Sequence, residues 1–224
     1  MKIAYPTFSN VVSIDCSKIS AIVIENKPLF RSFLYDLTLA IDGCNTDIVL
    51  SKNDKILDPS KNAELLTDFI NFNINKKPLL NKILSELEKT ALAPENYVKT
   101  QELIAEINRM FDEWAFSFPC NIVANKISVS TLLKSAGIEL QNEYEGHIGE
   151  AEKLLDYMEL VREFERDKLF ITVNMRSYFD DNIIRQFQKT AISHEFKMLM
   201  IESQAYSLLE YEKRITIDED LCEF

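Results

Sequence analysis

Glycine is scarce in this chain, with four in 224 residues. A phosphate loop needs closely spaced glycines, whose backbone N–H groups wrap the phosphates, followed by a lysine and a hydroxyl residue. The one close pair, Gly146 and Gly149, has no Lys-Ser or Lys-Thr after it and no apolar strand directly before it. The sequence therefore gives no support to ATP or GTP hydrolysis, and none to dinucleotide binding.

Cysteine and histidine are also few, and none of them stands at the spacing of a zinc site or a catalytic pair. They are Cys16, Cys44, Cys120, Cys222, His147 and His194. Such scattered cysteines are more typical of free thiols in a reducing cytosol than of disulfides. The two histidines are more simply interpreted as surface or helix-end residues than as metal ligands.

Long apolar runs are missing as well, since none approaches the roughly 20 residues that cross a bilayer. The first residues, Met-Lys-Ile-Ala-Tyr-Pro-Thr, lack the continuous apolar segment of a signal peptide. The composition, 46% hydrophobic and 27% charged, is that of an ordinary globular protein. We expect a cytoplasmic protein without a membrane segment.

The net charge of −11 argues superficially against a nucleic-acid partner, but the charge is unevenly distributed. Residues 1–94 hold 11 basic and 11 acidic side chains, whereas residues 95–224 hold 14 and 25. Local potential rather than net charge decides where an anion docks. The candidate phosphate contacts are lysines of the first part: Lys52, Lys55, Lys61, Lys76, Lys77 and Lys82. The alternative is that they only solvate helix faces.

Carboxylates form two clusters that can hold a hard cation such as Ca²⁺ or Mg²⁺, or can simply be solvated acidic surface. One is Asp218-Glu-Asp220, and the other comprises Glu139, Glu143, Glu145, Glu150 and Glu152. Neither has the alternating spacing of a calcium loop. The metal site therefore stays unknown at this point.

The clearest pattern lies between Lys168 and Ser203. Two short apolar runs, Lys168–Asn174 and Met198–Glu202, flank a segment with helical spacing that follows Asp180 and Asp181. Two such runs around one amphipathic helix predict a βαβ unit with parallel strands covered on both faces. Asn174, at the end of the first strand, has no role that the sequence assigns.

The remaining segments predict an α/β head interrupted by helices. Strands are expected within 1–25, at 48–50 and at 214–217, and helices at 28–43, 95–118, 125–137 and 149–167. Residues 60–92 are interpreted as two further helices, the first carrying Ala63, Leu66 and Phe69 inward. The predicted domains are an α/β head of 1–90 and 168–224 and a helical leg of 91–167.

Several segments, in this order, resemble the small DNA-binding adaptation protein of type II-A CRISPR systems. The family's K-x-x-E-L pattern, its D-V-N-S-x-P-x-L segment, its L-x-K-A-L-G stretch and its strand ending in Asn, with a tyrosine after it, have similar counterparts here. These are Lys61–Ile70, Asn73–Leu80, Leu132–Glu139 and Leu169–Asn174 with Tyr178. The resemblance runs nearly end to end.

The resemblance implies a non-enzymatic protein of antiviral defence. Its head would hold a mixed sheet related to nucleotide-binding folds but lacking the phosphate loop, with an inserted helical leg. The family forms a homotetrameric ring that takes the end of linear double-stranded DNA into a lysine-lined channel during spacer acquisition. Its partners are the CRISPR integrase proteins and the RNA-guided effector nuclease.

One departure from the family concerns Ca²⁺. Several members bind it through acidic residues before the L-x-K-A-L-G stretch, but residues 118–127 contain no carboxylate here. Calcium is thus implied by the resemblance alone, and no bound nucleotide is expected. Two other functions stay open: a scaffold for the integration complex that docks through the charged helix 149–167, and a metal-dependent nuclease.

Overall fold

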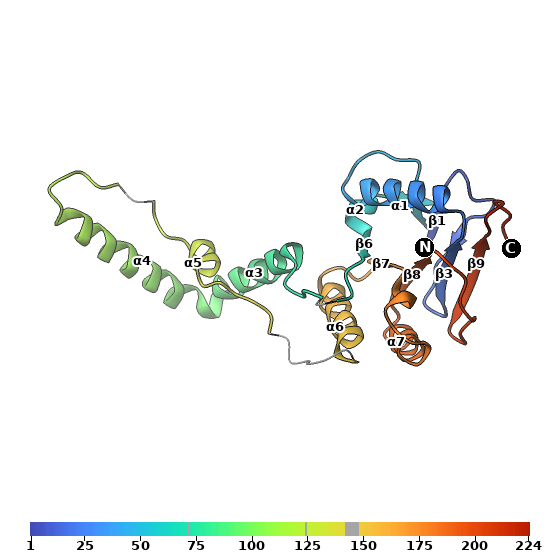
Figure 1. Ribbon diagram of the computed structural model, residues 1–224. Coiled ribbons are helices and arrows are strands. Elements are labelled where there is room, and N and C mark those ends of the chain that lie inside the picture. The colour runs from blue at the N-terminus through green and yellow to red at the C-terminus, as the bar shows by residue number, and fades with distance from the viewer. Residues whose placement is uncertain (71, 124, 142–147) are drawn as a thin grey trace. The chain divides into compact units, whose positions relative to one another are not determined.

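The computed structural model describes residues 1–70, 72–123, 125–141 and 148–224 (Figure 1). The predicted features at Gly146, His147, Glu143 and Glu145 lie outside the described residues. The chain divides into two compact units, a head of residues 1–72 and 143–224 and a helical unit of residues 73–142. These bounds differ from the expected 1–90, 91–167 and 168–224.

The head is built around a five-stranded sheet in the order β6–β7–β8–β3–β9, with every neighbouring pair parallel. Its strands are β6 (Ala63–Leu66), β7 (Leu169–Val173), β8 (Lys197–Glu202), β3 (Ile19–Ile24) and β9 (Glu212–Ile217). The predicted βαβ unit is confirmed as β7, α7 (Asp181–Ser193) and β8, with the short helix η1 (Met175–Ser177) after β7.

A second, antiparallel sheet has the order β2–β1–β4–β5. Its strands are β1 (Lys2–Ala4), β2 (Val12–Ser13), β4 (Val49–Lys52) and β5 (Lys55–Leu57). Asn53 and Asp54 have φ of 50° and 59°, the left-handed backbone that a tight two-residue hairpin turn requires. The predicted α/β class is confirmed, but the strands form two sheets and not one mixed sheet.

The main core contains residues of both sheets and of α1 (Lys27–Ile41). Helix α1 packs over one face of the parallel sheet. Leu29, Phe33, Leu37 and Ala40 form its buried stripe. Helix α7 covers the opposite face (Figure 1). Burial on both faces explains why β7 and β8 are almost continuously apolar.

The prediction of a helix at about residue 63 is wrong. A single helical turn, α2 (Pro59–Asn62), is followed directly by strand β6, which pairs with β7 from Ala63 opposite Leu169 to Leu66 opposite Thr172. A short apolar run fits a buried strand and a buried helix equally well by spacing alone. Pairing with β7, more than 100 residues later in the chain, decides between them.

Helix α6 (Ile148–Phe164) belongs to the head rather than to a leg. Its buried face carries Leu154, Tyr157, Met158 and Val161, and it packs against α7. The Tyr157 hydroxyl donates a hydrogen bond to Glu64 of β6. The charged outer face that suggested a separate leg is thus the solvent side of a head helix.

The helical unit contains α3 (Lys77–Ala91), α4 (Pro94–Phe116) and α5 (Val129–Ser135). Asparagine side chains brace its irregular segments: Asn75 exchanges hydrogen bonds of 3.1 and 2.7 Å with Leu140, and Asn108 does the same with Ile127. Helix α4 has no buried residue. Within the described part of the chain, no helix is both long and apolar enough to span a membrane.

Candidate nucleic-acid interface

Two of the candidate lysines flank the β4–β5 turn. Lys52 ends β4 and Lys55 begins β5, directly opposite each other in the ladder. Lys55 is exposed, while the Nζ of Lys52 lies 2.5 Å from an Oδ of Asp167. The tight turn at Asn53 and Asp54 therefore places two cations side by side at the end of a hairpin.

Lys61 lies on α2, two residues before the start of β6. Its side chain is 80% exposed, and its Nζ is 3.5 Å from Asp58, the residue that caps α2. An exposed pair at this distance contributes little to stability and leaves the ammonium group accessible to a phosphate. The backbone carbonyl of Lys61 accepts a hydrogen bond of 3.1 Å from Lys168.

The amino-terminal edge of the parallel sheet carries cations that the sequence analysis missed. Asp167 accepts from both Lys52 and Lys197, and these two bonds lower the pKa of its carboxyl group to about 2, with Lys197 the larger cause. Arg162 and Arg166 line the adjoining hollow together with Lys197. The sequence contains a signal for Lys197. It is the first residue of a buried strand, so it must lie at the end of the sheet where the parallel strands begin.

This edge is not purely basic. The same hollow is lined by Glu163, Asp167 and Glu195, so its positive and negative side chains are balanced in number. The ammonium group of Met1 has a lowered pKa, first because it is partly buried and then because Lys197 and Lys52 repel its charge. Three cations thus share one region with Asp167 as the acceptor of two of them.

The other three candidates gather at the start of α3, in the helical unit. Lys76 is the residue before α3, Lys77 is its first residue, and Lys82 follows in the second turn. Lys77 is exposed, and Lys76 and Lys82 are half-buried. Cations at a helix N-terminus oppose the helix dipole, so stabilisation of the helix does not account for them. The candidates therefore form two groups of three, each within its own unit.

The structure assigns Asn174 a role at the carboxyl end of β7. Its backbone is left-handed, with φ of 52°, and its N–H donates to Ile201 at 2.8 Å. Its side-chain oxygen accepts from the N–H of Ser203, also at 2.8 Å. Asn174 thus joins the ends of β7 and β8 and is a structural residue.

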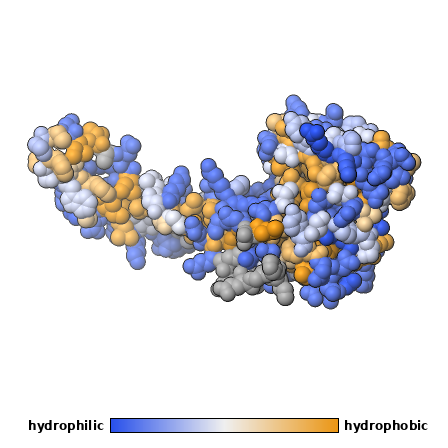
Figure 2. Space-filling model, viewed as in Figure 1, coloured by the Kyte–Doolittle hydropathy of each residue, from blue (hydrophilic) through white to orange (hydrophobic). Residues whose placement is uncertain are grey.

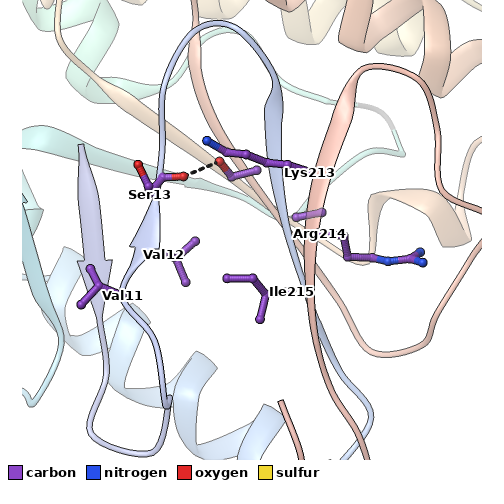
Figure 3. A pocket seen from close by; sticks show the side chains of 8 residues that line it. Val11, Val12, Ser13, Lys213, Arg214 and Ile215 are labelled. Carbon is purple, nitrogen blue, oxygen red and sulfur yellow. Dashed lines mark hydrogen bonds between the residues drawn. The ribbon is translucent and has the colours of Figure 1, made fainter. Parts of the chain in front are cut away.

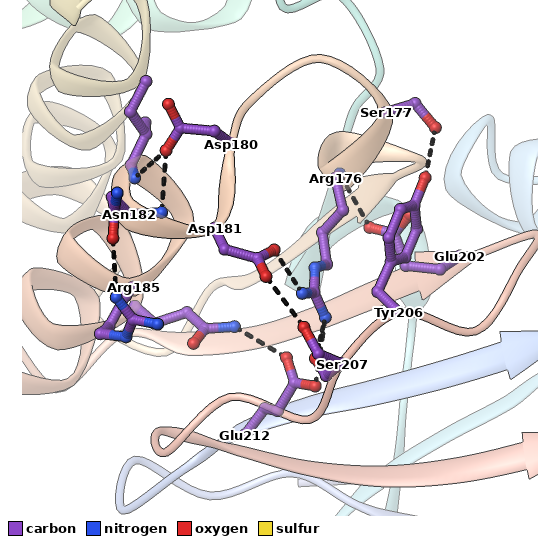
Figure 4. A network of polar contacts seen from close by, with 12 residues as sticks. Arg176, Ser177, Asp180, Asp181, Asn182, Arg185, Glu202, Tyr206, Ser207 and Glu212 are labelled. Atoms are coloured by element: carbon purple, nitrogen blue, oxygen red, sulfur yellow. Dashed lines mark hydrogen bonds and ion pairs between the residues drawn. The ribbon is translucent and has the colours of Figure 1, made fainter.

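A buried polar network holds the loops at this end of the head (Figure 4). Arg176, 7% exposed, lies 2.7 Å from Asp181 and 3.4 Å from Glu212, and its guanidinium group stacks over Tyr206. Gln188 donates to Glu212 at 3.0 Å. The network ties α7 and the segment before β9 to the sheet, so it is structural rather than a substrate site.

Glu202 is a buried carboxylate of this network that is only partly hydrogen-bonded. It is 2% exposed, its Oε1 accepts from the N–H of Arg176 at 3.2 Å, and its Oε2 has no hydrogen-bond partner. Burial raises the pKa of its carboxyl group to about 7, and the neighbouring Glu212 adds to the shift. Protonation of Glu202 removes its buried negative charge and the repulsion from Glu212.

The acidic clusters do not assemble a metal site in the part of the chain that the structure describes. No group of three or more His, Cys, Asp or Glu side chains there is placed to hold an ion. In the terminal cluster, Asp218 accepts from the N–H groups of Asp220 and Cys222 at 2.9 and 2.8 Å. These bonds organise a turn. The calcium implied by the resemblance stays a prediction.

The fold and the lysine groups define an α/β protein with a helical unit and two groups of lysines on an acidic chain. Among solved structures it is similar to "Crystal structure of Stu0660 of Streptococcus thermophilus", with a TM-score of 0.58 and 12% identity. That match covers 97% of this chain and 75% of the other. At this identity the likeness shows the fold.

The family is shown by sequence. The family model described as CRISPR-associated protein (Cas_Csn2) matches residues 41–221, which is most of the chain. The protein therefore belongs to the Cas_Csn2 family of CRISPR adaptation proteins, and the predicted type II-A resemblance is confirmed. A search of curated proteins gives no significant match.

Proposed function

We propose that this protein binds the ends of linear double-stranded DNA during CRISPR spacer acquisition, without catalysing a reaction, as a ring-shaped homotetramer. The integrase proteins and the RNA-guided effector nuclease would be its partners. Membership of the Cas_Csn2 family gives the adaptation role. The observation that carries DNA binding is the pair of exposed lysines, Lys55 and Lys61, beside the Lys52 hairpin position.

Phosphate contacts suit these positions better than base contacts. Lys52, Lys55 and Lys61 stand on a hairpin and a single helical turn, not on a helix that can enter a major groove. Flexible lysines on short elements neutralise phosphates, and such contacts carry no sequence information. Binding would be sequence-independent and strongly dependent on salt, because neutralised phosphates release their counterions.

The helical unit supports self-association. Apolar side chains gather on the surface of the helical unit (Figure 2). Those of α4 recur at helical spacing and remain exposed: Leu103 53%, Met110 40%, Phe111 42% and Trp114 54%. The ring of Phe111 packs edge-on against that of Trp114, with centroids 5.3 Å apart. A 23-residue helix with such a stripe and no buried residue is unlike a monomer's surface helix. A second copy in the ring would cover it.

The test compares duplex binding by the wild-type protein and a Lys55→Ala/Lys61→Ala variant over a series of salt concentrations. Both side chains are exposed, so the variant keeps the fold. We expect weaker binding of linear duplex and a slope of log affinity against log salt reduced by about two, one for each lost phosphate contact. Lys126→Ala/Lys134→Ala, which changes two exposed lysines outside the candidate set, is the matched control.

Binding to closed circular DNA separates threading of ends from contact along the duplex. Equal affinity for circular and linear DNA would contradict the ring that threads a DNA end. A flat salt dependence with no effect of the lysine substitutions would instead favour the scaffold function, with docking through α6. Duplex degradation by the purified protein with Mg²⁺ would favour a nuclease.

A further inference from the structure

Strand β9 is one edge of the parallel sheet, and only part of that edge is covered. Residues 213, 215 and 217 point their backbone groups at β3, so those of Glu212, Arg214 and Thr216 point outward. Thr216 is paired in both directions with Phe224, at 2.8 and 3.0 Å. Among the described residues, the outward N–H and C=O of Arg214 have no backbone partner.

A groove adjoins this open position, between β9 and β2 (Figure 3). Its volume is about 220 Å³, and its walls include Val11, Val12 and Ile215 with Ser13 and Lys213. Val11 is 54% exposed although it is aliphatic. The outward edge of β2 is open here too, since the Ser13 carbonyl accepts only from the side chain of Ser20, at 3.0 Å. The groove is thus an apolar slot between two strand edges.

The end of the chain shows how this edge accepts a strand. Residues 222–224 run antiparallel to β9, with Glu223 opposite Ile217. The Glu223 carboxylate accepts from the N–H of Ser9 and the side chain of Asn10, both at 2.7 Å, so the tail bridges β9 and the segment before β2. Followed from 222 to 224, the tail is directed along β9 toward Arg214 and the groove.

We propose that an extended peptide segment of a partner protein binds in this groove as an added strand, antiparallel to β9 and in line with residues 222–224. Its backbone would pair with Arg214, and its alternate side chains would fill the slot at Val11 and Ile215. A second copy fits less well, because two-fold pairing of β9 with β9 would be confined to Arg214. Phe224 already pairs with Thr216, and the N–H of Glu212 donates to Leu209.

The test pairs two substitutions of one residue. Arg214→Pro removes the outward N–H, and proline is tolerated on an edge strand where that group faces solvent. Arg214→Ala removes the same side chain, including its bond to the Tyr206 carbonyl, but keeps the N–H. The probe is the peptide acetyl-Thr-Val-Thr-Val-Glu-amide, titrated into the isotope-labelled full chain. Readouts are the exchange rate of the residue-214 amide hydrogen and the shifts of Val12 and Ile215.

We expect saturable binding to the wild type and to Arg214→Ala, with exchange of the residue-214 amide slowed at least about tenfold, and affinity lowered about tenfold or more in Arg214→Pro. The same five residues appended after Phe224 supply the strand at high local concentration. An unprotected Arg214 amide in that extended chain would overturn the proposal. So would equal peptide affinity of the two variants, or a change of oligomeric mass in Arg214→Pro, which would assign the edge to a second copy.

Discussion

Glu202 gives the head a stability that depends on pH near neutrality. Its folded-state pKa of about 7 lies above the ordinary 4.5, so the folded protein holds this proton more tightly than the unfolded chain. The contribution is fully present below pH 4.5 and is lost as pH rises through 7, a change of about 3 kcal/mol in the free energy of unfolding. Glu202→Gln keeps an acceptor for the Arg176 N–H and cannot ionise.

We therefore expect Glu202→Gln to flatten the fall in unfolding free energy between pH 5 and pH 8, measured by denaturant titration. Glu210→Gln, which changes an exposed carboxylate of the loop that follows β8, should leave the wild-type pH profile unchanged. A Glu202→Gln variant that loses stability with pH as steeply as the wild type would show that another group titrates.

Asp167 holds two lysines that would lie near DNA if the proposed function is right. It accepts from Lys52 and Lys197, and its own pKa of about 2 keeps it ionised at any working pH. Asp167→Asn should raise the affinity for linear duplex about threefold at low salt, because one carboxylate no longer competes with phosphate. Filter binding or fluorescence anisotropy would measure it, with Asp156→Asn as control. Unchanged affinity would place Lys52 away from the DNA.

At the scale of elements, a partly buried hydrogen bond joins α6 to β6, the edge strand of the parallel sheet. The hydroxyl of Tyr157, 1% exposed, donates to Glu64 of β6, and burial raises the pKa of that hydroxyl. Tyr157→Phe should lower the unfolding free energy by about 2 kcal/mol, the worth of a buried hydrogen bond to a charged group. Tyr97→Phe, on exposed surface, is the control. Equal stability of the two variants would contradict this.

The elements also show which features local sequence determines. The βαβ unit was predictable because β7 and β8 are buried on both faces and α7 has a strong helical period with Asp180 as its cap. Strand β6 was not, because its four residues depend on pairing with β7. For the candidate site, Lys55 and Lys61 were found by charge alone. Lys197 was missed, although its place as the first residue of a buried strand puts it where the strands of the sheet begin.

For the whole molecule, the exposed apolar stripe of α4 predicts that substitutions in it change the mass of the oligomer. Trp114→Glu places a charge in the middle of the stripe, where a partner helix would have to bury it. Because Trp114 is already 54% exposed, the variant should fold normally but show a smaller oligomer by light scattering. Gln101→Glu adds the same charge elsewhere on α4 and should keep the wild-type mass. An unchanged mass in Trp114→Glu would remove α4 from the oligomer interface.

The position of β3 decides when the head can be completed during synthesis. This strand is made early, yet its neighbours β8 and β9 come from the last 28 residues of the chain. Until residue 202 has left the ribosome, both edges of β3 lack their partner strands, and an unpaired apolar strand is prone to wrong pairing. The helical unit is one contiguous segment and can fold meanwhile. The parallel sheet of the head can therefore be completed only after the helical unit has been made.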